Sequence, residues 1–292
     1  MVAGAAGAPR RRGQASLRRL REHAIRPNHE LGQNFLVDDN LLAVIGEAAE
    51  LTPHDVVLEV GGGLGVLSEY LGPRVAHLHV VEVDPGLRAP LEEALAPFAA
   101  AASLHLADAL ELDFARLDPL PDKVVANLPY GIAATVILKS LEELPRAGLV
   151  VAMAQLEVAR RLAATPGGKI YGATSVLAQL SAGVRVERKV SRSVFHPPPN
   201  VDSALVVLVR HSPPPSLALN ALVHAAFAHR RKALAGSLAL APGARPGLRE
   251  RARAVLEAIG HPADARAERL APIDFERLAR RLEPADLDAL AG

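Results

Sequence analysis

Apolar residues in positions 31–211 alternate between short continuous runs and runs with a helical period. The continuous runs predict buried strands, and the periodic runs predict amphipathic helices. This regular alternation predicts a largely parallel sheet with helices on both faces. The predicted strands are Val56–Val60, Leu78–Val81, Leu104–Leu106, Lys123–Ala126, Leu149–Met153 and a closing antiparallel pair, Val184–Val190 and Ala204–Val209. The predicted helices are Leu41–Ala49, Val66–Leu71, Gly86–Leu95, Ile132–Leu144, Leu156–Ala163 and Ala173–Leu180.

Only helical patterns follow the proline-rich linker at residues 211–216. They cover Leu217–Ala228, Arg249–Ile259 and Asp274–Leu282. The first residues of the chain are rich in Gly, Ala and Arg without a clear apolar period, which is typical of disorder. The sequence therefore predicts a basic, disordered tail at residues 1–28, an α/β domain at residues 29–211 and a small all-α domain at residues 216–292.

One predicted strand, Lys123–Ala126, ends abruptly at Asn127-Leu128-Pro129-Tyr130. Pro129 lacks a backbone N–H and cannot continue a central strand, so we expect Asn127 at the carboxyl edge of the sheet, where α/β sheets bind ligands. The Asn127 side-chain oxygen and the Leu128 carbonyl could accept both hydrogens of a planar exocyclic amine, and Tyr130 could stack on the base. The alternative is a plain strand-to-turn junction.

A glycine-rich loop, Gly61–Gly65, lies between the first predicted strand and a helix, where backbone N–H groups can approach a ligand. Its first glycines fit a dehydrogenase, but the third falls one position early for G-x-G-x-x-G. With Glu59 the spacing is Glu-x-Gly-x-Gly-x-Gly, which resembles the first motif of class I S-adenosylmethionine-dependent methyltransferases. Glu82 ends the second strand, where an acid can bind both ribose hydroxyls, and Asp108 follows the third strand, where it can accept from an adenine amine.

Composition excludes several classes of protein. The chain of 292 residues has no Cys, which rules out disulfides and cysteine zinc sites and favours a cytoplasmic location. No apolar run approaches the roughly 20 residues of a membrane span. The net charge is only +1, but residues 1–30 carry +5 and residues 216–292 carry +3. Basic ends favour contact with nucleic acid, although solvated arginines explain them equally well.

Several motifs together resemble the KsgA/RsmA family of small-subunit ribosomal RNA adenine N6,N6-dimethyltransferases, from about Leu31 to Arg210 and again near the C-terminus. The motifs are Gly32–Leu36, Glu59–Gly63, Val81–Asp84, Asp108-Ala109, Asn127–Tyr130, Glu157–Leu162, Tyr171-Gly172, Ser175–Gln179, Phe195–Ser203, Phe227–Lys232 and Arg266–Leu270.

The resemblance implies a fold and an activity. The fold is that of class I S-adenosyl-L-methionine-dependent methyltransferases, α/β and Rossmann-like with a mostly parallel seven-stranded sheet, followed by a small all-α domain that binds RNA. The implied enzyme is a monomer that methylates the N6 amines of two adjacent adenines in 16S rRNA, on the immature 30S particle. A role in small-subunit biogenesis is implied as well.

The resemblance also assigns residues. Cofactor-binding roles fall on Asn34, Leu36, Gly61, Gly63, Glu82, Asp108 and Asn127. Catalytic roles, which include holding the target adenine, fall on Asn127, Leu128, Tyr130 and Phe195.

Basic residues on the substrate side are interpreted as contacts to RNA phosphates, with a solvated face as the alternative. They are Arg160, Arg161, Lys169, Arg188, Lys189 and a basic patch predicted on a helix, Arg230, Arg231 and Lys232. His77 and His79 share one face of a strand, but no third ligand is nearby, so no metal is expected.

Two departures concern the substrate loops. The family commonly has Asn and then Ser or Thr where this chain has Gly131-Ile132-Ala133, and often Lys at Leu156. Two other functions stay open: a large-subunit rRNA methyltransferase that confers macrolide resistance, and an assembly factor whose binding matters more than methylation. Phe195–Ser203 and Pro166–Gly172 are more similar to the small-subunit enzymes, and the intact Asn127–Tyr130 motif argues against a purely binding role.

Overall fold

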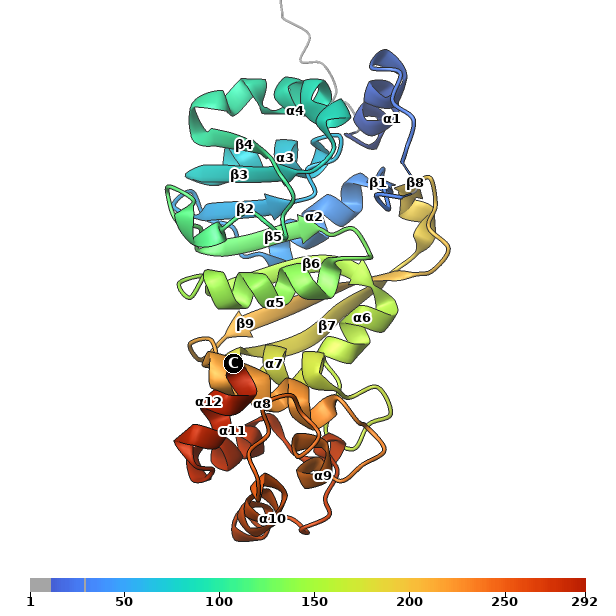
Figure 1. Cartoon of the computed structure of the whole chain (residues 1–292). Coiled ribbons are helices and arrows are strands. Elements are labelled where there is room, and N and C mark those ends of the chain that lie inside the picture. Colours follow the sequence, from blue (N-terminus) through green and yellow to red (C-terminus); the bar gives the residue numbers. More distant parts are fainter. Residues whose placement is uncertain (1–11, 29) are drawn as a thin grey trace, which may run out of the picture. The chain divides into compact units, whose positions relative to one another are not determined.

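A computed structural model represents the protein and describes residues 12–28 and 30–292 (Figure 1). Its main feature is a seven-stranded sheet with the order β4-β3-β2-β5-β6-β9-β7. The predicted α/β fold with a mostly parallel sheet is therefore confirmed. The strands are β2 (Val56–Val60), β3 (His77–Glu82), β4 (Ala102–Leu106), β5 (Lys123–Asn127), β6 (Leu149–Gln155), β7 (Ala182–Val190) and β9 (Ser203–Arg210).

The central strands pair in parallel, and their continuous apolar runs are buried. Leu58 of β2 pairs with Val124 of β5, and Val125 pairs with Val151 of β6. These side chains are at most 1% exposed, because helices cover both faces of a parallel sheet. All four parallel pairs carry their carboxyl ends to the same edge of the sheet, so the loops that follow β2, β3, β4 and β5 meet there.

The helices of the α/β region begin close to where the apolar period predicts them. Asp38 caps α2, because its side chain accepts from the backbone N–H groups of Asn40 and Leu41. The helices are α2 (Asp39–Ala48), α3 (Val66–Leu71), α4 (Arg88–Leu95), α5 (Ala133–Glu143), α6 (Leu156–Leu162) and α7 (Ala173–Ser181). Short 3₁₀ turns connect them, among them Pro85–Leu87, Phe114–Arg116 and Arg192–Val194.

The predicted disordered tail is wrong for residues 12–22. Residues Arg12–Glu22 form helix α1, whose inner face includes the buried residues Ser16 and Arg19. Tertiary contacts explain the difference, because this helix packs against α3 and β1 and has too few apolar residues to show a period of its own. Residues 1–11 of the predicted tail lie outside the described residues.

A second sheet of two short strands was not predicted. Strand β1 (Phe35–Leu36) pairs antiparallel with β8 (Phe195–His196), so that Leu36 lies opposite Phe195. Two-residue strands carry no periodic signal, and only their pairing defines them.

The chain forms two compact units, the first made of the residues through Leu156 together with Val186–Val207. The second unit combines Glu157–Arg185 with Leu208–Gly292, whereas the sequence predicted a helical domain from residue 216 onward. Within it, α7 packs against the C-terminal helices, and the Tyr171 hydroxyl, two residues before α7, donates to the Leu270 carbonyl.

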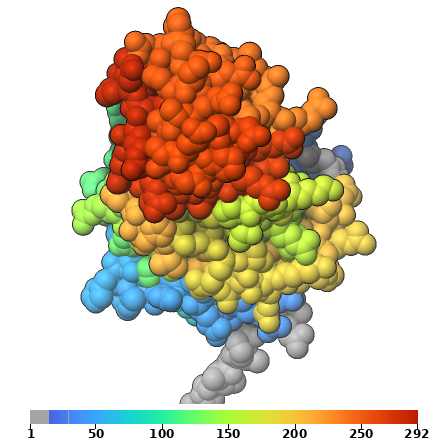
Figure 2. Space-filling model, turned by 90° about the horizontal axis from the view of Figure 1, so that it is seen from below, coloured from blue at the N-terminus to red at the C-terminus, as the bar shows by residue number. Residues whose placement is uncertain are grey.

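The C-terminal helices pack together in the second unit (Figure 2). The sequence predicted three of them, and the two others are the short α9 and the terminal α12. Their bounds are α8 (Leu217–Phe227), α9 (Leu234–Leu238), α10 (Leu248–Ala258), α11 (Pro272–Arg281) and α12 (Pro284–Ala291). Among the described residues, no helix is both long and apolar enough to cross a membrane.

Candidate active site

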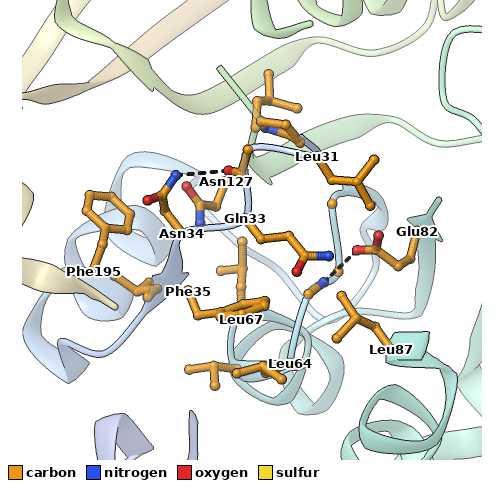
Figure 3. A pocket seen from close by; sticks show the side chains of 18 of the residues that line it. Leu31, Gln33, Asn34, Phe35, Leu64, Leu67, Glu82, Leu87, Asn127 and Phe195 are labelled. Carbon is orange, nitrogen blue, oxygen red and sulfur yellow. Dashed lines mark hydrogen bonds between the residues drawn. The ribbon is translucent and has the colours of Figure 1, made fainter. Parts of the chain in front are cut away.

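A pocket lies at the carboxyl edge of the sheet in the first unit, where the loops after β2, β3 and β5 meet (Figure 3). It brings together almost every residue predicted for the cofactor or for catalysis: Asn34, Leu36, Gly61, Gly63, Glu82, Asn127, Leu128, Tyr130 and Phe195. Figure 3 shows Asn34, Asn127 and Phe195 on one side of the pocket and Glu82 on the opposite side.

The glycine loop adopts backbone conformations that side chains disfavour. Gly61, Gly63 and Gly65 have φ values of +81°, +57° and +75°. A Cβ at Gly61 would lie 3.2 Å from the Asn127 carbonyl oxygen, and one at Gly65 would lie 2.3 Å from the Ala94 Cβ. The glycines therefore allow the loop to lie tightly against the Asn127 corner and against α4.

Glu82 is positioned by backbone donors. Its carboxylate accepts from the Gly63 N–H and the Asp84 N–H, each at 2.9 Å. Burial raises the pKa of Glu82, and these N–H donors oppose that rise. The arrangement leaves an acid at the end of β3 beside the glycine loop, which is where a ribose diol would be bound.

Asp108 lies in an adjoining pocket that the main one does not include. Gly61 and Glu82 line both pockets, and Ala107, Ala109 and Ile132 line only the second. The Asp108 carboxylate accepts from the Leu110 N–H at 2.8 Å. The two pockets thus adjoin at Gly61 and Glu82, and an elongated ligand could occupy both.

The Asn127 corner has the predicted geometry. Asn127 is the last residue of β5, and the Leu128 N–H donates to the Met153 carbonyl of β6 at 3.0 Å. The Asn127 side chain is half-buried and lines the pocket. The Tyr130 hydroxyl and the Ser203 hydroxyl are 2.6 Å apart, so the ring is held from β9. Burial raises the pKa of Tyr130, and the phenol is therefore neutral.

Leu36 and Phe195 close one wall of the pocket as a cross-strand pair of β1 and β8. Both are about 5% exposed or less, so each also belongs to the core. Asn34 lies just before β1, and its side-chain amide donates to the Gly32 carbonyl at 2.9 Å. Tyr130 and Asn34 extend into a further pocket, which Gln155 and residues 197–201 complete.

Sequence reasoning assigned no role to several residues that line the main pocket. Gln33 donates from its amide to the Asp84 carboxylate at 2.7 Å and joins the motif Gly32–Leu36 to the end of β3. Gln33 is part of the motif Gly32–Leu36, so that motif could have indicated a role for it. Ser16 carried no signal, because its segment was predicted to be disordered. The apolar lining residues Leu64, Leu67 and Leu87 are buried and also belong to the hydrophobic core.

Glu59 is the most perturbed carboxyl at this edge. It is 1% exposed, Ser68 donates to its Oε2 at 2.6 Å, and Oε1 has no partner among the described residues. Burial raises the pKa of Glu59 to about 8, with a smaller contribution from the charge of Glu82. The acid is therefore mostly protonated at neutral pH.

The predicted RNA-binding residues fall into two groups. Arg188 and Lys189 are exposed on β7 in the first unit, and Lys189 pairs with Asp202 at 2.7 Å. In the second unit Arg161, Lys169 and Arg230 line one open pocket with Phe227 and the first residues of α7. Arg160, Arg231 and Lys232 are exposed, also in the second unit.

The prediction of a helical basic patch at residues 230–232 is wrong. These residues form a turn between α8 and α9, in which the Lys232 N–H donates to the His229 carbonyl. Arg230 is held there by Glu268, at 3.2 Å, and by the Lys169 carbonyl. Arg and Lys have good helix propensity, and only partners distant in sequence, such as Glu268, hold these residues in a turn.

His77 and His79 do lie together on β3, with His105 of β4 beside them. The rings of His79 and His105 are joined by a 3.0 Å hydrogen bond, and the other His79 nitrogen lies 2.8 Å from the Pro119 carbonyl. Burial lowers the pKa of His79 to about 4. In the described part of the chain, no cluster of His, Asp and Glu could hold a metal ion.

Residues 24–255 match the family described as ribosomal RNA adenine dimethylase. The chain is 45% identical to ribosomal RNA small subunit methyltransferase A of Rubrobacter xylanophilus, over 89% of this chain and 96% of that protein. It is 43% identical to the protein of the same name from Thermobifida fusca, over 91% and 94%.

Two solved structures are similar to this chain. A 23S rRNA methyltransferase, ErmE, superposes with a TM-score of 0.64 and 30% identity, over 85% of this chain and 99% of that one. A dimethyladenosine transferase from Plasmodium falciparum reaches a TM-score of 0.72 over 84% and 95%, and at 24% identity it supports the fold alone.

Proposed function

The chain belongs to the ribosomal RNA adenine dimethylase family, and from that premise we propose that it transfers methyl groups from S-adenosylmethionine to the N6 amines of two adjacent adenines in 16S rRNA. The observation that carries the proposal is one pocket that contains both the glycine loop with Glu82 and the corner Asn127–Tyr130. A cofactor site and a base site at one edge of the sheet are what methyl transfer to a base requires.

The residues present fit S-adenosylmethionine. Gly61 has no side chain, and a Cβ there would lie 3.2 Å from the Asn127 carbonyl oxygen. The missing side chain leaves room for a ligand close to the backbone of the loop. Glu82 would bind the ribose hydroxyls, and Asp108 would accept from the adenine amine. Asn34, Leu36 and Gly63 would surround the methionine part. When bound, the cofactor supplies an activated methyl group on a sulfonium.

The chain's own residues would prepare the nucleophile. The N6 lone pair of adenine is delocalised into the ring. The Asn127 side-chain oxygen and the Leu128 carbonyl would accept the two amine hydrogens, which localises that lone pair and aims it at the methyl group. The neutral ring of Tyr130, held by Ser203, would stack on the extruded base. Phe195 would form the opposite wall.

The small subunit is the favoured source of the substrate RNA. The chain is 45% identical to a small-subunit methyltransferase and 30% identical to the large-subunit enzyme ErmE. The region Phe195–Ser203, which includes β8, is more similar to the small-subunit enzymes and supports the same choice. Its residues Pro197–Val201 line the further pocket beside Tyr130. Monomeric action on an immature 30S particle in the cytoplasm, and a role in its biogenesis, are part of this proposal.

Methylation of ribosomal particles tests the proposal. Tritiated S-adenosylmethionine is mixed with the protein and with undermethylated 30S particles or with 50S particles. Two dimethylated adjacent adenines in 16S rRNA are expected, located by primer extension, with no label in the 50S particles. Label in 23S rRNA would support the large-subunit alternative. Tight 30S binding without any transfer would support the assembly factor.

A further inference from the structure

Helix α1 contains an arginine that is buried as completely as a core residue. The Arg19 side chain is 2% exposed. Its guanidinium donates to the Leu64 carbonyl at 2.9 Å and to Glu93 at 3.4 Å, and it also pairs with Glu69 of α3. A buried cation of this kind is retained only where its donors meet acceptors.

The Leu64 carbonyl is the informative partner, because Leu64 belongs to the glycine loop. Four of the five loop residues in Gly61–Gly65 are glycines, so the loop has many conformations available when nothing holds it. The Leu64 side chain lines the main pocket, whereas Arg19 does not. Arg19 therefore contacts the loop from outside the pocket, and it fixes the peptide that leads from Leu64 into α3.

A second contact from α1 reaches another segment that lines the same pocket. Ser16 is fully buried, lines the pocket, and donates from its hydroxyl to the Leu36 carbonyl at 2.7 Å. Leu36 lies in β1, two residues after Asn34. One short helix thus holds both the glycine loop and the segment Asn34–Leu36.

We infer that Arg19 is a positioning residue of the cofactor site: through α1 it holds the glycine loop in the conformation that binds S-adenosylmethionine. The inference rests on the proposed function of this pocket. Affinity depends on it because a loop that is already ordered loses less conformational entropy when the ligand binds. Arg19 does not line the pocket, so it acts through the loop that it holds.

The neighbouring Arg18 provides a matched control. It lies on the same helix and pairs with the same Glu93, at 2.9 Å, but its side chain is 43% exposed and makes no contact with the loop. Arg19→Met keeps the buried aliphatic volume and removes the donors, whereas Arg18→Met removes only two outer ion pairs, to Glu22 and Glu93. A role limited to holding α1 on the surface would make the two variants similar.

Calorimetry of the full-length protein with S-adenosylmethionine is the test. Arg19→Met should raise the Kd by about 10- to 50-fold and the cofactor KM in parallel, with kcat at saturating cofactor within about twofold of wild type. Hydrogen exchange at the amides of Leu64 and Gly65 should become faster. Arg18→Met should change the Kd by less than about twofold.

An unchanged Kd in folded Arg19→Met protein would overturn the inference. So would equal losses in both variants. If Arg19→Met does not fold, Arg19→Lys replaces it, because one ammonium cannot serve Leu64, Glu69 and Glu93 together, and a Kd equal to wild type would overturn the inference as well. Wild-type protein that binds no S-adenosylmethionine would instead reject the proposed function.

Discussion

Asn127 is the last residue of the central strand β5, and its half-buried side chain lines the pocket instead of packing in the core. Asn127→Ala should therefore leave the fold intact and lower the rate of methyl transfer by at least ~100-fold, since one oriented acceptor is worth roughly 3 kcal/mol in the transition state. The measurement is single-turnover transfer of tritium to undermethylated 30S particles. Asn40→Ala, at an exposed position of α2, is the control. A near-wild-type rate would make the corner purely structural.

Glu82 should determine cofactor affinity in two ways, since it faces the proposed ribose and also holds the Gly63 N–H. Glu82→Ala should weaken S-adenosylmethionine binding by on the order of 2–3 kcal/mol. Glu82→Gln should lose less, because one amide oxygen can still accept from Gly63. Calorimetry compares the three proteins. Equal affinities would move the ribose contact elsewhere, and binding of NAD in place of S-adenosylmethionine would favour a dehydrogenase.

Glu59 should make stability depend on pH. Its pKa of about 8 in the folded protein exceeds its ordinary value of 4.5, so the folded state binds more protons between these values. The contribution of Glu59 is thus fully present below about pH 4.5 and is lost as pH rises, by up to about 1.4 kcal/mol per pH unit.

Replacement by glutamine removes this titration. As the pH rises from 5 to 8, the stability of Glu59→Gln relative to wild type should increase by on the order of 1 kcal/mol or more. Urea unfolding at the two pH values measures the difference, because the other titrating groups are common to both proteins. Glu47→Gln, exposed on α2, should show no such change. Parallel stability curves for Glu59→Gln and wild type would show that Glu59 is ionised in the fold.

At the scale of elements, the join between the glycine loop and α3 depends on close packing. A Cβ at Gly65 would meet Ala94 of α4 at 2.3 Å in a left-handed backbone conformation, whereas a Cβ at Gly63 would meet Phe35 at 3.4 Å. Gly65→Ala should therefore destabilise the protein by about 2–4 kcal/mol, through overpacking and backbone strain. Gly63→Ala should cost about 1–2 kcal/mol, from backbone strain alone. Thermal unfolding of both variants tests this order, and the reverse order would contradict it.

At the scale of the whole molecule, RNA binding should depend on the basic turn of the second unit. Replacing Arg230, Arg231 and Lys232 by Ala should weaken binding to 30S particles and reduce the salt slope by about two to three units. Arg230 also pairs with Glu268, so part of its charge is already compensated. The double variant Arg280→Ala, Arg281→Ala removes exposed charge from α11 and serves as the comparison. An unchanged slope for the triple variant would mean that this turn faces solvent in the complex.

Much of the first unit follows from the sequence, because its signals are local. Continuous apolar runs such as Val56–Val60 become buried strands in any sheet covered on both faces. Pro129 ends β5 wherever that strand lies, and parallel strands carry Gly61, Glu82 and Asn127 to one edge. The order of these motifs along the chain therefore predicted which residues would meet in one pocket.

Other features were decided only by the tertiary structure, because they depend on partners far away in sequence. Arg19 gives α1 its place through Leu64, Glu69 and Glu93, and no period within a short Arg-rich segment shows that. The pairing of Leu36 with Phe195 spans most of the first unit. The raised pKa of Glu59 arises from complete burial of one carboxyl, and burial is a property of the packed molecule rather than of the residue. Sequence thus determined which groups reach the sheet edge, and packing determined how they are held and charged there.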